Sequence, residues 1–234
     1  MGSRKRKYRD GHRKIKALLK KEYGIELDRN TVQKTMQKYH LQCKVKQKRK
    51  WKSQGESVVI APNVLNRNFT ASKTNEKWVT DIMYIQYGSV TLYLSTIMDL
   101  YNNEIVTYKL YNHQQIPLVM DTLREALVAR GNPQGVIVHS DQGSVYTSYA
   151  YQDALKRNHL VSSISRRGNC WDNAVIESFH SSLKTEEFNL TKFNSLNNVS
   201  VVQRIDEYIR HYNEDRIQEK LGYLAPKEFG IAAA

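Results

Sequence analysis

Apolar and polar residues alternate through two β-rich runs in the second third of the chain, residues 77–87 and 89–100. Gly88 lies between these runs, and the arrangement predicts two antiparallel strands joined as a hairpin. A third strand is predicted over residues 104–111, after a turn with the sequence Tyr-Asn-Asn. The first part of the core is therefore expected to be an antiparallel sheet.

Beyond residue 115 the apolar period becomes that of amphipathic helices, which are separated by two short apolar runs typical of buried strands. Helices are predicted over residues 116–131, 148–158, 172–188 and 199–216, and short strands over residues 135–141 and 160–165. Asp172 is the expected cap of the third of these helices. This order of elements predicts an α/β fold, in which helices flank a mixed sheet with an antiparallel edge.

The N-terminal region has the pattern of two short helices. Apolar residues recur at helical spacing from Ile15, and Gly24 ends the run. A second helix is predicted to follow a cap at Asp28 or Asn30, with Val32, Met36 and Tyr39 on its inner face. Two helices joined by a turn that contains Gly, with Arg and Lys outside, fit a helix-turn-helix. The alternative is a basic helical hairpin that does not enter a DNA groove.

The net charge of +13 is concentrated at the N-terminus. Residues 1–52 contain 19 Lys and Arg against 4 Asp and Glu, whereas residues 53–234 contain 17 against 19. Such a basic segment suits a polyanion, and nucleic acid is favoured over a membrane surface because no amphipathic aromatic stripe accompanies the charge. The basic side chains expected to contact DNA are Arg13, Lys14, Arg29, Lys34, Lys48, Arg49 and Lys50.

Composition also divides the chain. We expect a basic helix-turn-helix domain and basic tract at residues 1–52, a linker at 53–67, and an α/β core with a C-terminal helical extension at 68–234. No apolar stretch approaches the roughly 18 residues that a membrane span needs. The two cysteines, Cys43 and Cys170, are far apart and favour neither a disulfide framework nor a zinc knuckle, so a reducing cytoplasm is expected.

Three acidic residues of the predicted core could converge on one site. Asp81 lies inside the first core strand, where an unpaired charge is costly, and Asp141 ends a later strand. The two carboxylates would meet if these strands are neighbours. Glu177 lies on a predicted helix, and the polar residues expected on its face are Asn173, Ser181 and Lys184. The alternatives are an outward-facing strand aspartate, a turn aspartate and a solvated helix face.

Carboxylates from separate elements are the ligands that a phosphoryl-transfer site would need. Mg²⁺ prefers oxygen ligands and is usually held by a few carboxylates, while it keeps waters and phosphate oxygens. Two such ions roughly 3.5–4 Å apart can activate the attacking oxygen and stabilise the leaving one.

Other residues near these acids are weaker candidates. Arg166 and Arg167 precede the third predicted helix and are expected to contact DNA from a mobile loop, unless they form an ordinary helix entry. His139 could orient the site or touch phosphate, although a packed and hydrogen-bonded histidine is the commoner outcome. Asp99 is expected to have a turn or capping role.

A close resemblance to a known family is carried by the segments "WVTDIMYI", "HSDQGSVYTS" and "SRRGNCWDNAVIESFHSSLKTE". They are similar to the catalytic core of insertion-sequence transposases of the retroviral-integrase type, which has a ribonuclease-H-like fold. The 35 residues between Asp141 and Glu177 match the spacing of the last two acids in that DDE group. The ending "YIRHYNEDRIQEKLGYLAPKEF" resembles the family's C-terminal signature, and residues 11–41 resemble its helix-turn-helix module.

The resemblance implies a DNA transposase, a metal-dependent enzyme that cleaves phosphodiesters and transfers strands at insertion-sequence ends. Asp81, Asp141 and Glu177 would form the DDE triad and bind two Mg²⁺ ions, for which Mn²⁺ is expected to substitute. Lys184 would contact DNA near the cut. The expected partners are transposon-end and target DNA, bound by a dimer or larger homo-oligomer. The protein is expected in the bacterial cytoplasm, associated with the nucleoid. The chain resembles the downstream of two reading frames that such elements join by frameshifting.

Two other functions stay open at this point. One is a structure-selective nuclease on the same fold, which would cut strands without joining them. The other is a non-catalytic DNA-binding regulator. A structural zinc site is not expected, because His12, His40 and Cys43 lack the second nearby cysteine of the zinc domain that precedes the core in retroviral integrases.

Overall fold

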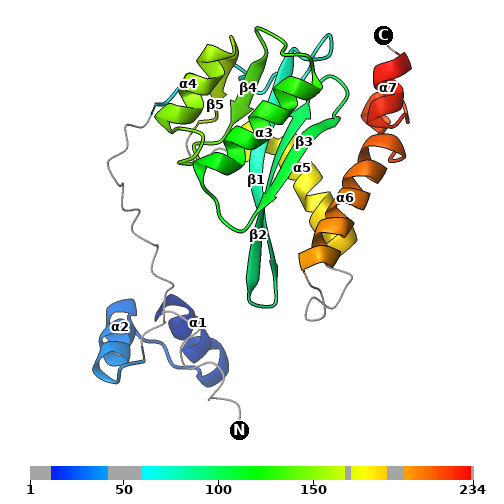
Figure 1. The fold of residues 1–234 in the computed structure, drawn as a ribbon. Coiled ribbons are helices and arrows are strands. Elements are labelled where there is room, and N and C mark those ends of the chain that lie inside the picture. The colour runs from blue at the N-terminus through cyan, green and yellow to red at the C-terminus, as the bar shows by residue number, and fades with distance from the viewer. Residues whose placement is uncertain (1–11, 42–58, 167–169, 189–197, 233–234) are drawn as a thin grey trace. The chain divides into compact units, whose positions relative to one another are not determined.

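The computed structural model describes residues 12–41, 59–166, 170–188 and 198–232 (Figure 1). The chain separates into two compact units, residues 1–54 and 55–234. Among the helices of the described residues, none has both the length and the apolar character that crossing a membrane requires.

The first unit contains the two predicted helices, α1 (His12–Tyr23) and α2 (Arg29–Lys38). Of the two expected caps, Asp28 is the one that caps α2, because its side chain accepts the backbone N–H of Asn30 at 2.7 Å. Val32 and Met36 are buried as expected. Tyr39 does not share their face and is 60% exposed, because it follows the last helical residue at the C-cap.

The second unit is built on a mixed sheet of five strands in the order β3-β2-β1-β4-β5. The strands are β1 (Lys77–Tyr87), β2 (Val90–Asp99), β3 (Ile105–Tyr111), β4 (Ile137–Ser140) and β5 (Val161–Ile164). The pairs β1–β2 and β2–β3 are antiparallel, and the pairs β1–β4 and β4–β5 are parallel. The predicted mixed sheet with an antiparallel edge is confirmed.

Helices cover both faces of this sheet (Figure 1). On one face, α3 (Ile116–Ala129) and α4 (Tyr149–Arg157) enclose a core that includes Trp78 and Val138. On the other, α5 (Ala174–Leu183) and α6 (Asn198–Glu214) enclose a core that includes Val79. Because successive side chains of a strand point to opposite faces, the odd-numbered core residues of β1 face α5 and α6.

The C-terminal third differs from the prediction in detail. The helix expected over residues 172–188 begins with a 3-10 turn (Cys170–Asn173), continues as α5 and ends in a π-helical turn (Lys184–Phe188). A further short helix, α7 (Pro226–Ala232), was not predicted, because seven residues are too few to establish a helical period.

Part of the predicted linker contacts the core. The backbone N–H of Val59 donates to the Thr147 carbonyl at 2.9 Å, and that of Leu65 donates to Ser163 Oγ at 3.0 Å. Leu65 is buried in the core between the sheet and α5 and α6. Residues 59–67 therefore belong structurally to the second unit, because the apolar side chain of Leu65 is removed from water there.

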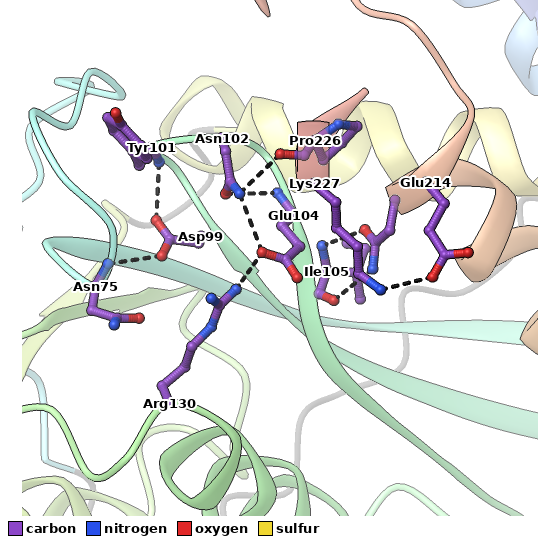
Figure 2. Close-up of polar contacts among 11 residues, drawn as sticks. Asn75, Asp99, Tyr101, Asn102, Glu104, Ile105, Arg130, Glu214, Pro226 and Lys227 are labelled. Atoms are coloured by element: carbon purple, nitrogen blue, oxygen red, sulfur yellow. Dashed lines mark hydrogen bonds and ion pairs between the residues drawn. The ribbon is translucent and has the colours of Figure 1, made fainter. Parts of the chain in front are cut away.

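Polar side chains connect the β2–β3 turn to the C-terminal helices (Figure 2). Asp99 accepts the backbone N–H groups of Asn75 and Tyr101 at 2.8 and 3.0 Å, which confirms its predicted turn role. Asn102 donates to the carbonyl of Pro226 at 3.1 Å, at the first residue of α7. This directed hydrogen bond joins the turn to α7.

Asp172 is a buried anchor rather than the predicted helix cap. Its carboxylate accepts hydrogen bonds from Arg166 Nε and Nη2, both at 3.0 Å, from Arg67 Nε at 2.8 Å and from Asn63 Nδ2 at 2.9 Å. The hydrogen bonds from Arg166, and then those from Arg67, hold the pKa of Asp172 well below its usual range, although burial opposes them. These bonds connect the entry to α5 with residues 63–67.

We predict that Asp172→Asn lowers the free energy of unfolding by about 1–3 kcal/mol at neutral pH, because the hydrogen bonds from Arg166 and Arg67 lose their anionic acceptor. The folded-state pKa is depressed, so this contribution is present above the pKa of an unfolded aspartate, about 3.9, and is lost as the pH falls below it. Denaturant unfolding at several pH values measures both effects. Asp153→Asn, which removes the surface ion pair with Arg157, is the control; an equal loss there would contradict the prediction.

Candidate active site

The register of the sheet places Asp81 beside Asp141. Val79 of β1 pairs in parallel with His139 of β4. Two residues beyond this pair come Asp81, still within β1 and on the face that α5 covers, and Asp141, in the turn directly after β4. The adjacency of β1 and β4 therefore brings the two acids near each other, as the sequence predicts if their strands are neighbours.

Asp141 lies in the tight turn that follows β4. Its Oδ1 accepts the backbone N–H of Gly143 at 2.8 Å. A Cβ atom on Gly143 would lie 2.8 Å from that same Oδ1, so a side chain at this position would displace the Asp141 carboxylate. Burial and, to a smaller degree, the negative charge of Asp81 raise the pKa of Asp141, and the Gly143 hydrogen bond opposes them.

Glu177 is exposed on α5, in the first turn of that helix. Burial of its carboxyl group and the charges of Asp81 and Asp141 raise its pKa, and the nearby His180 opposes this shift. The three predicted acids thus lie close enough for their charges to interact. Within the described part of the chain, however, no group of three His, Cys, Asp or Glu side chains is arranged to hold one metal ion.

A cavity of about 410 Å³ lies between β1 and α5. Its lining includes Asp81, Glu177 and Lys184. The Lys184 ammonium lies 4.7 Å from the centroid of the Tyr84 ring, a cation–π distance. The cavity therefore combines acidic groups, a cation and an exposed aromatic ring.

The predicted polar face of α5 is present in part. Glu177, Ser181 and Lys184 all line the cavity. Asn173 does not share this face, since it is 3% exposed at the residue before α5 begins.

His180 was not identified from the sequence, yet it also lines the cavity. Its Nδ1 lies 3.3 Å from Asp81 Oδ2, and its Nε2 lies 2.9 Å from Thr96 Oγ1. Its position three residues after Glu177, and so on a neighbouring part of the helix surface, is the signal that could have found it.

The remaining predicted residues have varied surroundings. The side chain of Arg166 is held by Asp172 and is half exposed. His139 is fully buried, its Nδ1 lies 2.8 Å from Ser163 Oγ, and burial lowers its pKa to about 4. It is therefore the packed, hydrogen-bonded histidine of the alternative interpretation.

In the first unit, the side chains of Arg13, Arg29 and Lys34 are exposed. Outside the described residues lie the side chain of Lys14 and the residues Arg167, Lys48, Arg49 and Lys50.

Comparison with known proteins identifies both units. Residues 3–49 match an HTH-like domain, and residues 71–170 and 159–226 match two models of an integrase core domain. The transposase InsK of insertion sequence element IS150 from Escherichia coli K12 is 38% identical over 94% of this chain and 77% of its own length. The chain belongs to the family of insertion-sequence transposases with an integrase core. A transposase-like protein of Haemophilus influenzae is 40% identical to this transposase over 88% of the chain and 94% of its own length.

Solved structures share the fold of the transposase core. The catalytic core domain of HTLV-2 integrase, in complex with magnesium, superposes with a TM-score of 0.55 at 13% identity, over 68% of this chain and 99% of its own. The simian T-cell lymphotropic virus intasome gives a TM-score of 0.61 at 14% identity, over 92% of this chain and 70% of its own. The fold is therefore the ribonuclease-H-like fold of retroviral integrase cores, as the resemblance implies.

We predict that Gly143→Ala lowers DNA cleavage by roughly a hundredfold, because the new methyl group displaces the Asp141 carboxylate and small displacements of a reacting group have effects of this order. Cleavage of a labelled transposon-end duplex measures the change, and circular dichroism checks the fold. Ser144→Ala, in the same turn with its side chain exposed, is the control. Full activity in Gly143→Ala would show that this turn does not determine where Asp141 acts.

Proposed function

We propose that this transposase cleaves and joins DNA at a single centre formed by Asp81, Asp141 and Glu177. The observation that carries the proposal is that acids from β1, from the turn after β4 and from α5 lie close enough for their charges to interact: burial, and then the charge of Asp81, raise the pKa values of Asp141 and Glu177. Raised pKa values that arise from burial together with a like charge are typical of functional sites.

The cofactor in this proposal is Mg²⁺, as two ions, with Mn²⁺ as a substitute. Asp81, Asp141 and Glu177 would hold them, and the donor set fits because all three offer carboxylate oxygens, which these hard cations prefer. The mutual repulsion of the three acids also fits, since a cation would relieve it. Bound there, the ions would lower the pKa of the attacking hydroxyl and stabilise the leaving oxygen.

The reaction is a pair of phosphoryl transfers. In the first, a water oxygen displaces the 3′ oxygen of the transposon end, which leaves as a free 3′-OH. In the second, this 3′ oxygen attacks a phosphodiester of the target, and the displaced target 3′ oxygen leaves with a proton. Lys184, at the side of the cavity, would hold a phosphate there by its charge. Arg166 and Arg167 remain proposed DNA contacts near the entry to α5.

DNA binding is divided between the two units in this proposal. The helix-turn-helix module and basic tract, residues 1–52, would bind transposon-end DNA mainly through phosphates, while the core binds the cut site and the target. A dimer or larger assembly is proposed because two DNA ends must be cut and joined together. The place of action would be the bacterial nucleoid in the cytoplasm, where both DNA substrates are found.

We predict that Asp81→Asn, Asp141→Asn and Glu177→Gln each lower cleavage roughly a thousandfold or more, as removal of one essential group of a site does. Binding of transposon-end DNA should stay within about threefold, since the phosphate contacts that dominate affinity are kept. Gel assays of cleavage and binding in Mg²⁺ and Mn²⁺ measure both quantities.

Asp153→Asn, which changes an acid of α4 outside the cavity, is the control for these variants and should cleave normally. Full cleavage by any one triad variant would overturn the assignment. A pre-cut end with a 3′-OH separates a transposase from a nuclease on the same fold, because only the transposase joins that end to a target.

Deletion of residues 1–52 should weaken binding of transposon-end DNA and flatten its salt dependence. The log–log slope should fall by about 0.9 for each DNA phosphate that the shortened protein no longer neutralises. Binding measured by fluorescence anisotropy over a range of salt concentrations gives the slope. An unchanged affinity and slope would show that this basic region does not supply the main DNA-binding surface.

A further inference from the structure

The His180 side chain bridges two strands beneath the cavity. Asp81 of β1 and Thr96 of β2 are directly paired in the antiparallel register. His180 of α5 approaches both members of this pair, with Nδ1 3.3 Å from Asp81 Oδ2 and Nε2 2.9 Å from Thr96 Oγ1. The imidazole is 6% exposed, and Thr96 is fully buried. One buried ring therefore connects α5 to both strands.

One tautomer of the imidazole satisfies both contacts. Nδ1 is in ion-pair contact with Asp81 Oδ2, and because an ionised carboxylate can only accept, this contact favours a hydrogen at Nδ1. In a neutral ring, Nε2 is then an acceptor, and the Thr96 hydroxyl can donate to it. The other neutral tautomer would place the lone pair of Nδ1 against the negative charge of Asp81. The chain from the Thr96 hydroxyl through His180 to Asp81 thus has one favourable direction.

We propose that His180 is a positioning residue for Asp81. By engaging Oδ2 it fixes the rotation of the Asp81 carboxylate and leaves Oδ1 for a cation. It also restrains α5 against β1 and β2, because its two ring nitrogens contact Asp81 of the first strand and Thr96 of the second. The inference rests on the proposed function, in which Asp81 and Glu177 bind the same metal ions.

The geometry explains why one histidine would matter for two ligands. Glu177 and His180 are three residues apart on α5, so they are neighbours on the helix surface. Fixing the His180 ring against the Asp81–Thr96 pair therefore sets where Glu177 lies relative to Asp81. Residues that hydrogen-bond a metal ligand typically change metal affinity by about 10- to 100-fold when they are removed.

A substitution series separates positioning from space filling. His180→Phe keeps an aromatic ring and removes both nitrogens. His180→Asn restores a donor near the Nδ1 position, and Thr96→Val removes only the hydroxyl at the other end. His211→Phe is the matched control, because His211 is a partly exposed histidine of α6 in contact with Asp215.

The first measurement is the Mn²⁺ concentration for half-maximal cleavage by the full chain, with calorimetric Mn²⁺ binding as a readout that is independent of activity. We expect His180→Phe to raise the half-maximal Mn²⁺ concentration and the Mn²⁺ dissociation constant by about tenfold each. Cleavage should be largely recovered at saturating Mn²⁺. His180→Asn should recover part of this loss, and His211→Phe should match the parent. A purely structural histidine would lower the unfolding temperature and leave the half-maximal Mn²⁺ concentration unchanged, which would overturn the proposal.

The second measurement is the imidazole tautomer in the metal-free protein, from long-range ¹H–¹⁵N correlations of ¹⁵N-histidine, assigned by the signal that His180→Phe removes. We expect the form protonated at Nδ1 at neutral pH, and Thr96→Val should weaken this preference. Finding the form protonated at Nε2 would overturn the proposal. If His180→Phe failed to fold, the His180 signal could still be assigned from its loss in His180→Asn and from its change in Thr96→Val.

The two proposals fail in different ways. Normal cleavage by Asp81→Asn would overturn the proposed function, and with it the role of His180. The positioning role alone would be overturned if Asp81→Asn were inactive while folded His180→Phe needed no more Mn²⁺ than the parent.

Discussion

The parallel pairing of β1 with β4 is the constraint on which the rest of the site depends. It sets Asp81 and Asp141 side by side, two residues beyond the Val79–His139 pair. A shift of β1 by one residue in its pairing with β4 would turn the Asp81 side chain to the face covered by α3 and α4. The shift is opposed because Trp78 and Val138 are buried on that face and Val79 on the other. Hydrophobic burial therefore specifies the position of two charges.

Two aspartates of this chain, Asp172 and Asp141, have contrasting electrostatic surroundings. Asp172 is surrounded by donors, and the arginines that bind it lower its pKa. Asp141 is partly buried, and burial and, to a smaller degree, the negative charge of Asp81 raise its pKa. In the first case the positive partner is part of the protein, so the charge is already compensated. In the second case the compensation is incomplete, and a cation or a cationic ligand is what would complete it.

The sequence predicted the elements whose signal is local. β1 has the predicted bounds because the run from Lys77 to Tyr87 is rich in β-forming residues and Gly88 follows it. Asp81 and Asp141 could be connected because both lie on strands that the chain order makes candidates for neighbours. The contacts of Leu65 with Ser163 and of Arg166 with Asp172 had no such signal. The first joins residues 98 apart, and the second depends on how the chain turns before α5.

His180 was missed for a related reason. In the sequence it is a polar residue in an amphipathic helix, next to the apolar Phe179. Its spacing from Glu177 places it near that residue on the helix surface but does not indicate that Asp81 and Thr96 are its partners. Its role follows only from the pairing of β2 with β1, which sets Thr96 opposite Asp81. Side chains that act through another residue are defined by long-range geometry, and local periodicity contains little of it.

The C-terminal segment that resembles the family signature acquires a physical role from the structure. The side-chain amide of Asn213 accepts the N–H of Ile105 and donates to its carbonyl, both at 2.9 Å, so α6 is joined to the edge strand β3. Arg216 forms an ion pair with Glu186 in the π-helical turn that follows α5. The Tyr208 hydroxyl donates to the same carboxylate at 3.1 Å. These contacts hold the end of α5 beside Lys184, so residues far from the cavity restrain the helix that presents Glu177 to it.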